Sequence, residues 1–184
     1  DLHSFPTRRS SDLKMGVDKI LAREKELLKI AFPGLHKIPG ITILAENVED
    51  RLAVISFYHK DIHFNLLVKL LNDKFGIQVR GGCACAGTYG HYLLQVSHEK
   101  SQEITDKINH GDLSEKPGWV RWSLHPTMTD KEVELFLFAL EEIVKNFHLW
   151  EKDYIYLNKK NEFFHKNEID QNREMELIKD WFTL

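Results

Sequence analysis

The apolar residues of this chain repeat at two spacings, and these spacings predict where helices and strands lie. Three segments place apolar residues every three or four positions, as on the buried face of a helix. They span about residues 17–31, 66–75 and 133–147. Pro33-Gly34 is expected to end the first helix and Gly76 to cap the second. Thr129 and Glu132 have the spacing of a capping box, which predicts the start of the third.

Short runs rich in β-branched and aromatic residues predict the strands. They occupy about residues 41–44, 52–58, 77–80 and 119–124. A short helix at 101–109, stopped by Gly111, separates the last two strands. This order of elements is typical of an α+β layer structure. We therefore expect a mixed or antiparallel sheet covered by helices.

The composition changes near the C-terminus. Two short apolar runs, Tyr154–Leu157 and Glu162–His165, flank a polar turn and predict a β-hairpin, and residues 169–182 predict a terminal helix. The chain is therefore expected to hold one domain over residues 14–148. A C-terminal extension, a hairpin plus a helix, is expected over residues 149–184.

The first 13 residues, DLHSFPTRRSSDL, follow neither spacing. They can be back-translated into a string that resembles a common sequencing-adapter oligonucleotide. We therefore expect an artefact joined to a truncated gene, which makes no packed contacts and is excluded from fold reasoning. An exposed native N-terminus is the alternative.

Composition and charge exclude several classes of function. Hydrophobic residues make up 42% of the 184 residues, which is enough for a packed core. The net charge of -3 gives no general affinity for nucleic acid or an anionic membrane surface. No apolar run approaches the roughly 20 residues that span a bilayer. Only two cysteines occur, so we expect a reducing, cytoplasmic setting without a disulfide framework.

The segment from Arg80 to Gly87, RGGCACAG, is the part of the chain most suited to chemistry. Its glycines and alanines let the backbone approach a ligand closely. A nearby cation favours the thiolate, the reactive form of cysteine, and a guanidinium offers a planar fork to a carboxylate. A plain turn or a buried structural cysteine are the alternatives. A metal site is not expected, because no third ligand has suitable spacing.

This loop and Gly118–Leu124, GWVRWSL, together resemble the small C-terminal domain of class V aminotransferase-like enzymes. That family includes cysteine desulfurases, selenocysteine lyases and molybdenum cofactor sulfurases. Its members share a strand that ends in arginine before a cysteine-containing loop, and later an R-x-S-L strand followed by an amphipathic helix. The resemblance covers about residues 15–148. It implies the small domain of a pyridoxal-phosphate (PLP) enzyme of fold type I.

The resemblance also implies roles for three residues. Cys85 falls on the desulfurase nucleophile, whose thiolate takes the sulfur of a PLP-bound cysteine, releases alanine and remains as a persulfide. Arg121 falls on the arginine that clamps the substrate α-carboxylate. Arg80 falls on the arginine before the loop, which helps to orient the substrate.

The chain departs from the family pattern at several positions. Ala84 stands where many desulfurases have histidine, and Cys83 is an extra thiol similar to that of the sulfurase-like members. The connection to Arg121 is also longer. Within it, His91 is a candidate acid or base, with a surface or structural histidine as the alternative. Cys83 and His91 are therefore auxiliary candidates.

The groups that hold PLP in this family come from an upstream domain, with the lysine in an S-x-H-K context. Ser56-Phe57-Tyr58-His59-Lys60 is a near match with one extra residue, and we expect Lys60 to be a surface lysine. We therefore expect no cofactor-binding residue here and no activity of the chain alone. The parent is expected to be a homodimeric PLP enzyme acting on a cysteine-like amino acid. The alternative is a stand-alone module, without PLP, whose C-x-C loop carries sulfur or senses redox state.

Overall fold

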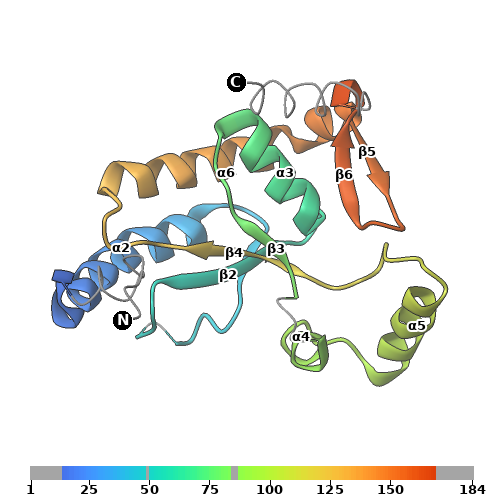
Figure 1. Cartoon of the computed structure of the whole chain (residues 1–184), viewed down its shortest axis with the longest axis horizontal. Coiled ribbons are helices and arrows are strands. Elements are labelled where there is room, and N and C mark those ends of the chain that lie inside the picture. The colour runs from blue at the N-terminus through green and yellow to red at the C-terminus, as the bar shows by residue number, and fades with distance from the viewer. Residues whose placement is uncertain (1–13, 49, 84–86, 169–184) are drawn as a thin grey trace, which may run out of the picture. The chain divides into compact units, whose positions relative to one another are not determined.

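The computed structural model describes residues 14–48, 50–83 and 87–168 (Figure 1). The first 13 residues, Cys85 and the predicted helix at 169–182 lie outside the described residues. The chain divides into two compact units, described separately below. The first joins residues 1–85 to 118–145, and the second joins residues 86–117 to 146–184.

The first unit is built on a four-stranded antiparallel sheet in the order β1-β2-β4-β3. Its strands are β1 (Ile41–Ile43), β2 (Val54–His59), β3 (Arg80–Gly82) and β4 (Trp119–Ser123). The helix α3 (Phe64–Phe75) connects β2 to β3, crossing β4 in the sheet order. The predicted α+β fold class is confirmed, and this sheet is antiparallel throughout.

One face of the sheet carries the core. Ile55 and Phe57 of β2 are fully buried, and so is Val120, the partner of Phe57 on β4. The helix α6 (Asp130–Trp150) packs on this face, because its Phe136 ring stacks on Trp122 at 3.7 Å between ring centroids. Phe136 also meets Phe57 edge to face at 6.2 Å. Aromatic burial of this kind dominates core energetics.

The helix α2 (Val17–Lys37) runs past the predicted end at Pro33-Gly34, so that boundary was wrong. A proline inside a helix costs about 3 kcal/mol. Here Phe32 and Leu35 on either side of it are buried, and their burial offsets that cost. Gly34 also lies so close to Leu137 of α6 that a side chain at this position would overlap it.

The third strand lies two to three residues later than predicted, over Arg80–Gly82 instead of residues 77–80. The reason is the close approach of α3, which packs against β3 and β4. A Cβ atom on Gly81 would lie 2.7 Å from Asn65 Oδ1, and one on Gly118 would lie 2.6 Å from the Phe64 ring. The strand ladder therefore forms where glycine leaves room for the helix.

The second unit holds α4 (Gly87–Leu93), α5 (His98–Asn109) and the predicted hairpin, β5 (Tyr154–Leu157) with β6 (Glu162–His165). Short 3-10 helices, η1 (Glu151–Asp153) and η2 (Lys166–Glu168), flank the hairpin. The helix α4 was not predicted, because its glycine and tyrosine residues show no apolar stripe. The helix α5 starts earlier than predicted, where the Ser97 hydroxyl accepts a hydrogen bond from the Lys100 amide.

Hydrogen bonds join the segment after α5 to the hairpin. The Leu113 amide donates to the Asn158 carbonyl at 3.1 Å, and the Tyr156 hydroxyl lies 3.4 Å from the Leu113 carbonyl. These bonds close the second unit on itself. Among the described helices of the chain, none is long and apolar enough to cross a membrane.

Candidate functional site

Three polar residues stand in one row across three neighbouring strands of the first unit. Arg80 of β3 is the direct partner of Arg121 of β4 in their antiparallel ladder. Ser56 of β2 is the partner of Arg121 on its other side. Directly opposite residues lie on the same face of a sheet with Cβ atoms about 4.5–5.5 Å apart. We call Ser56, Arg121 and Arg80 the polar row.

The polar row lies on the face of the sheet opposite to the core. Side chains alternate between the two faces along a strand. The sequence neighbours of Arg121 are Val120 and Trp122, both buried on the core face, so Arg121 points the other way. Arg80 is exposed, while Ser56 and Arg121 are half-buried. The two arginines therefore lie on adjacent strands and on the same face of the sheet.

The electrostatics of the polar row favour an anion. Like charges directly opposite each other destabilise a sheet. Within the described ranges, neither Arg80 nor Arg121 forms an ion pair with a carboxylate. The Nε atom of Arg121 is buried and has no hydrogen-bond partner there. An unsatisfied buried donor costs about 1–3 kcal/mol, and a bound anion would remove that cost.

The thiol loop begins directly after β3. Gly82 has a φ of 111°, which glycine adopts readily, and Cys83 follows it with a half-buried free thiol. The predicted nucleophile, Cys85, lies outside the described residues. The structure therefore places the start of the loop next to Arg80, and the roles of both cysteines stay predictions.

His91 has a defined partner within the second unit. Its Nδ1 atom lies 2.6 Å from the Ser101 hydroxyl oxygen and joins α4 to α5. This contact fits the structural alternative for His91. Its role as an acid or base stays a prediction.

Lys60 does not fit the role of a lysine that holds PLP. Lys60 of the near-match motif follows β2 directly, its side chain is 71% exposed, and its Nζ atom lies 3.8 Å from Asp61 Oδ2. A Schiff-base lysine needs a site that closes around the cofactor. Over the same described ranges, no cluster of three or more His, Cys, Asp or Glu residues could hold a metal ion.

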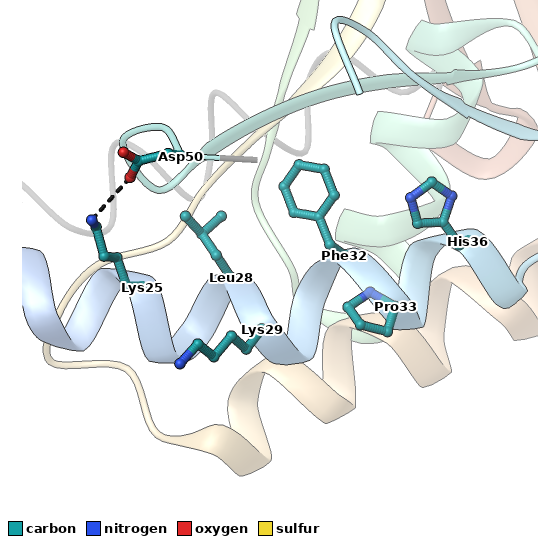
Figure 2. Close-up of a pocket in the computed structure, with 7 residues that line it drawn as sticks. All are labelled: Lys25, Leu28, Lys29, Phe32, Pro33, His36 and Asp50. Carbon is teal, nitrogen blue, oxygen red and sulfur yellow. Dashed lines mark ion pairs between the residues drawn. The ribbon is translucent and has the colours of Figure 1, made fainter. Parts of the chain in front are cut away.

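A separate groove of about 390 Å³ runs along α2 (Figure 2). Leu28 and Phe32 point from the helix toward the segment that carries Asp50, and Lys25 Nζ pairs with Asp50 Oδ1 at 2.9 Å. The Arg51 guanidinium lies 5.1 Å from the centre of the Phe32 ring. None of the polar-row residues lines this groove, so it is not part of the candidate site.

Sequence reasoning missed Ser56 as a member of the site. The alternation of β2 places Ser56 opposite to its buried neighbours Ile55 and Phe57. That signal was available in the sequence. The strand register was not, and only the register reveals that Ser56 stands beside Arg121.

Comparison with known proteins identifies similar domains. The family model described as aminotransferase class-V matches residues 12–136. A "Probable cysteine desulfurase" of Pyrococcus abyssi is 32% identical over 133 residues, which cover 72% of this chain and 28% of that protein. A "Probable cysteine desulfurase" of Streptomyces coelicolor is 40% identical over 73 residues, which cover 39% of this chain and 17% of that protein.

The solved structures include a similar fold. The apo structure of a cysteine desulfurase from Thermococcus onnurineus NA1 superposes with a TM-score of 0.50 at 25% sequence identity. The match covers 73% of this chain and 28% of that one. The chain therefore spans only 28% of the length of the P. abyssi protein and 28% of the T. onnurineus chain.

Proposed function

The chain belongs to the class-V aminotransferase family, and from that membership we propose that it supplies the sulfur-accepting thiol and the carboxylate-binding arginines of a cysteine desulfurase-like enzyme. The observation that carries this proposal is the polar row. Two arginines at directly paired positions of neighbouring strands, without an acidic partner in the described residues, suit the α-carboxylate of an amino acid.

The proposed role of Arg121 is to hold the carboxylate through its planar fork. Arg80, which is more exposed, adds a second positive charge and restricts the rotation of the bound amino acid. When a substrate is held at its carboxylate, its side-chain sulfur can move only within a small volume. The loop starts at Cys83 directly after β3, and the proposed nucleophile follows two positions later in the sequence.

The proposed reaction at Cys85 is the transfer of one sulfur atom. Its thiolate attacks the sulfur of the substrate, a bond forms between the two sulfur atoms, and the bond between that sulfur and the substrate β-carbon breaks. The carbon takes up a proton, so the products are alanine and a persulfide on Cys85. Electron withdrawal from the substrate carbon is chemistry that PLP supplies when bound, and the groups that hold it are proposed to lie outside this chain.

The wider setting follows from the same proposal. The parent enzyme is proposed to be a PLP-dependent homodimer that acts on cysteine or a close analogue in the cytoplasm. A free thiol at Cys83 and the small number of cysteines support a reducing compartment. Family membership does not favour the alternative of a stand-alone sulfur carrier or redox sensor.

The test uses the chain extended by the upstream part of its reading frame, recovered by sequencing the locus. Alanine release from L-cysteine is measured together with the persulfide, located by mass spectrometry. We expect Cys85→Ala to abolish both while the absorbance of bound PLP is kept, and Cys83→Ala to have the smaller effect. Full activity of Cys85→Ala, with activity lost in Cys83→Ala, would overturn the assignment of the nucleophile. Transamination instead of alanine release would discard the desulfurase function.

A further inference from the structure

The polar row contains a third group beside the two arginines. Ser56 of β2 pairs directly with Arg121, which pairs in turn with Arg80, so Arg121 lies between a hydroxyl and a second guanidinium. The Ser56 side chain is half-buried, on the face of the sheet away from the core. Its backbone carbonyl is already used, because it accepts the Leu44 amide at 2.8 Å. The side-chain hydroxyl is therefore the group of Ser56 that can contact a ligand on this face.

Within the described residues, no protein group accepts a hydrogen bond from the Ser56 hydroxyl. The Nε atom of Arg121 is buried and has no hydrogen-bond partner there either. Two donors on neighbouring strands therefore lie on the same face of the sheet without an acceptor among the described residues. A carboxylate has two oxygens with about four acceptor sites, of which a guanidinium fork uses two. The Cβ atoms of Ser56 and Arg121 are expected to lie about 5 Å apart, as in other directly opposite pairs. The Ser56 hydroxyl is therefore well placed to donate to a third acceptor site of the carboxylate.

We infer that Ser56 is a third carboxylate-binding group, which donates its hydroxyl proton to the amino-acid carboxylate held by Arg121. This inference rests on the proposed function and deepens it, because it assigns the carboxylate a specific orientation. The oxygen on the β2 side of Arg121 accepts from Ser56, and the oxygen on the β3 side lies nearer Arg80. A hydroxyl can do this without a charge of its own, so it adds no repulsion to Arg121.

The test uses the ¹⁵N-labelled chain titrated with L-alanine, which carries the α-carboxylate but no thiol. The Arg121 Nε–H resonance and the β4 amides report binding by NMR. We expect Ser56→Ala to raise the dissociation constant about fivefold, the loss of one ordinary hydrogen bond. Ser56→Thr, which keeps the hydroxyl, should stay within about twofold of wild type on the same reasoning. Ser123→Ala, on the same face two positions further along β4, should bind as wild type does.

Two results would count against the inference, and they are distinguishable. If Arg121→Gln weakens binding but Ser56→Ala binds as wild type does, Ser56 has no part in the site and the arginine clamp stands. If wild type and Arg121→Gln respond identically to L-alanine, the carboxylate site itself fails, and Ser56 fails with it.

Discussion

Arg80 and Arg121 are direct cross-strand partners on the outer face of an antiparallel sheet, and no described carboxylate neutralises either of them. A sheet gains nothing in stability from two like charges placed opposite each other. Such an arrangement is expected where a negatively charged ligand is to be held. The Arg80–Arg121 pair should therefore lower the stability of the sheet and favour the binding of an anion. The two effects can be measured separately.

Reversing one of the two charges should stabilise the fold and remove the binding site. For Arg80→Glu we expect the free energy of unfolding to rise by about 0.5 kcal/mol, since an opposite-charge pair replaces a like-charge pair. The same variant should no longer bind L-alanine. Urea denaturation and the NMR titration measure the two effects. Arg80→Gln is the control and should give a smaller gain; a loss of stability in both variants would contradict the electrostatic argument.

Arg121→Lys should weaken the extended enzyme chiefly through substrate binding. An ammonium keeps the charge but cannot reproduce the two parallel hydrogen bonds of the guanidinium fork. We expect the KM for L-cysteine to rise roughly tenfold or more, from the loss of one charge-assisted hydrogen bond. Steady-state kinetics of alanine release check this. An unchanged KM with normal turnover would show that Arg121 does not contact the carboxylate.

Gly118→Ala should destabilise the first unit. A Cβ atom there would lie 2.6 Å from the ring of Phe64, the buried first residue of α3. Overpacking of this kind costs about 1–3 kcal/mol. Phe64→Leu in the same chain should relieve the overlap, so the double variant should lose less stability than the sum of the two single variants. Additive losses would mean that the overlap is not the cause.

Glu115 should make the second unit sensitive to acid. The side chains of Lys100 and Lys107 both hydrogen-bond it and lower its pKa from 4.5 to about 2. A depressed carboxyl pKa in the folded state stabilises the fold above pH 4.5, and this contribution is lost as the pH falls toward 2. Because the Glu115 side chain is 35% exposed, the effect should be small and screened by salt.

The measurement is the thermal midpoint of unfolding between pH 6 and about 2, the range in which that linkage operates. Glu115→Gln should flatten the pH dependence in low salt. Glu103→Gln is the matched control, because among the described residues Glu103 pairs with Lys100 alone, at the longer distance of 3.1 Å. An equal effect of both substitutions would contradict the special role of Glu115.

The sequence predicts those elements whose ends carry local signals. Gly76 takes the left-handed conformation at a φ of 67° and ends α3 as expected. The capping box is also formed, since Glu132 accepts from the Thr129 amide at 2.7 Å. The hairpin has its predicted bounds, because a polar turn separates two apolar runs. Each of these signals involves only residues close together in the chain.

The errors occur where distant residues decide the outcome. Pro33 remains inside α2 because the surrounding apolar residues are buried. The start of β3 depends on how closely α3 approaches Gly81. In the candidate site, both arginines were found by resemblance to a family. Ser56 was missed, because its place beside Arg121 is a property of the register between β2 and β4.

The pairing of β3 with β4 also bears on how such a domain can evolve. The ladder fixes Arg80 opposite Arg121 whatever the length of the connection between Gly82 and Trp119. That connection here contains two helices, and its own hydrogen bonds close it against the C-terminal hairpin. A lineage can therefore lengthen, shorten or exchange this insertion without moving the two guanidinium groups. Selection can then alter what surrounds the thiol while the proposed carboxylate-binding site is inherited unchanged.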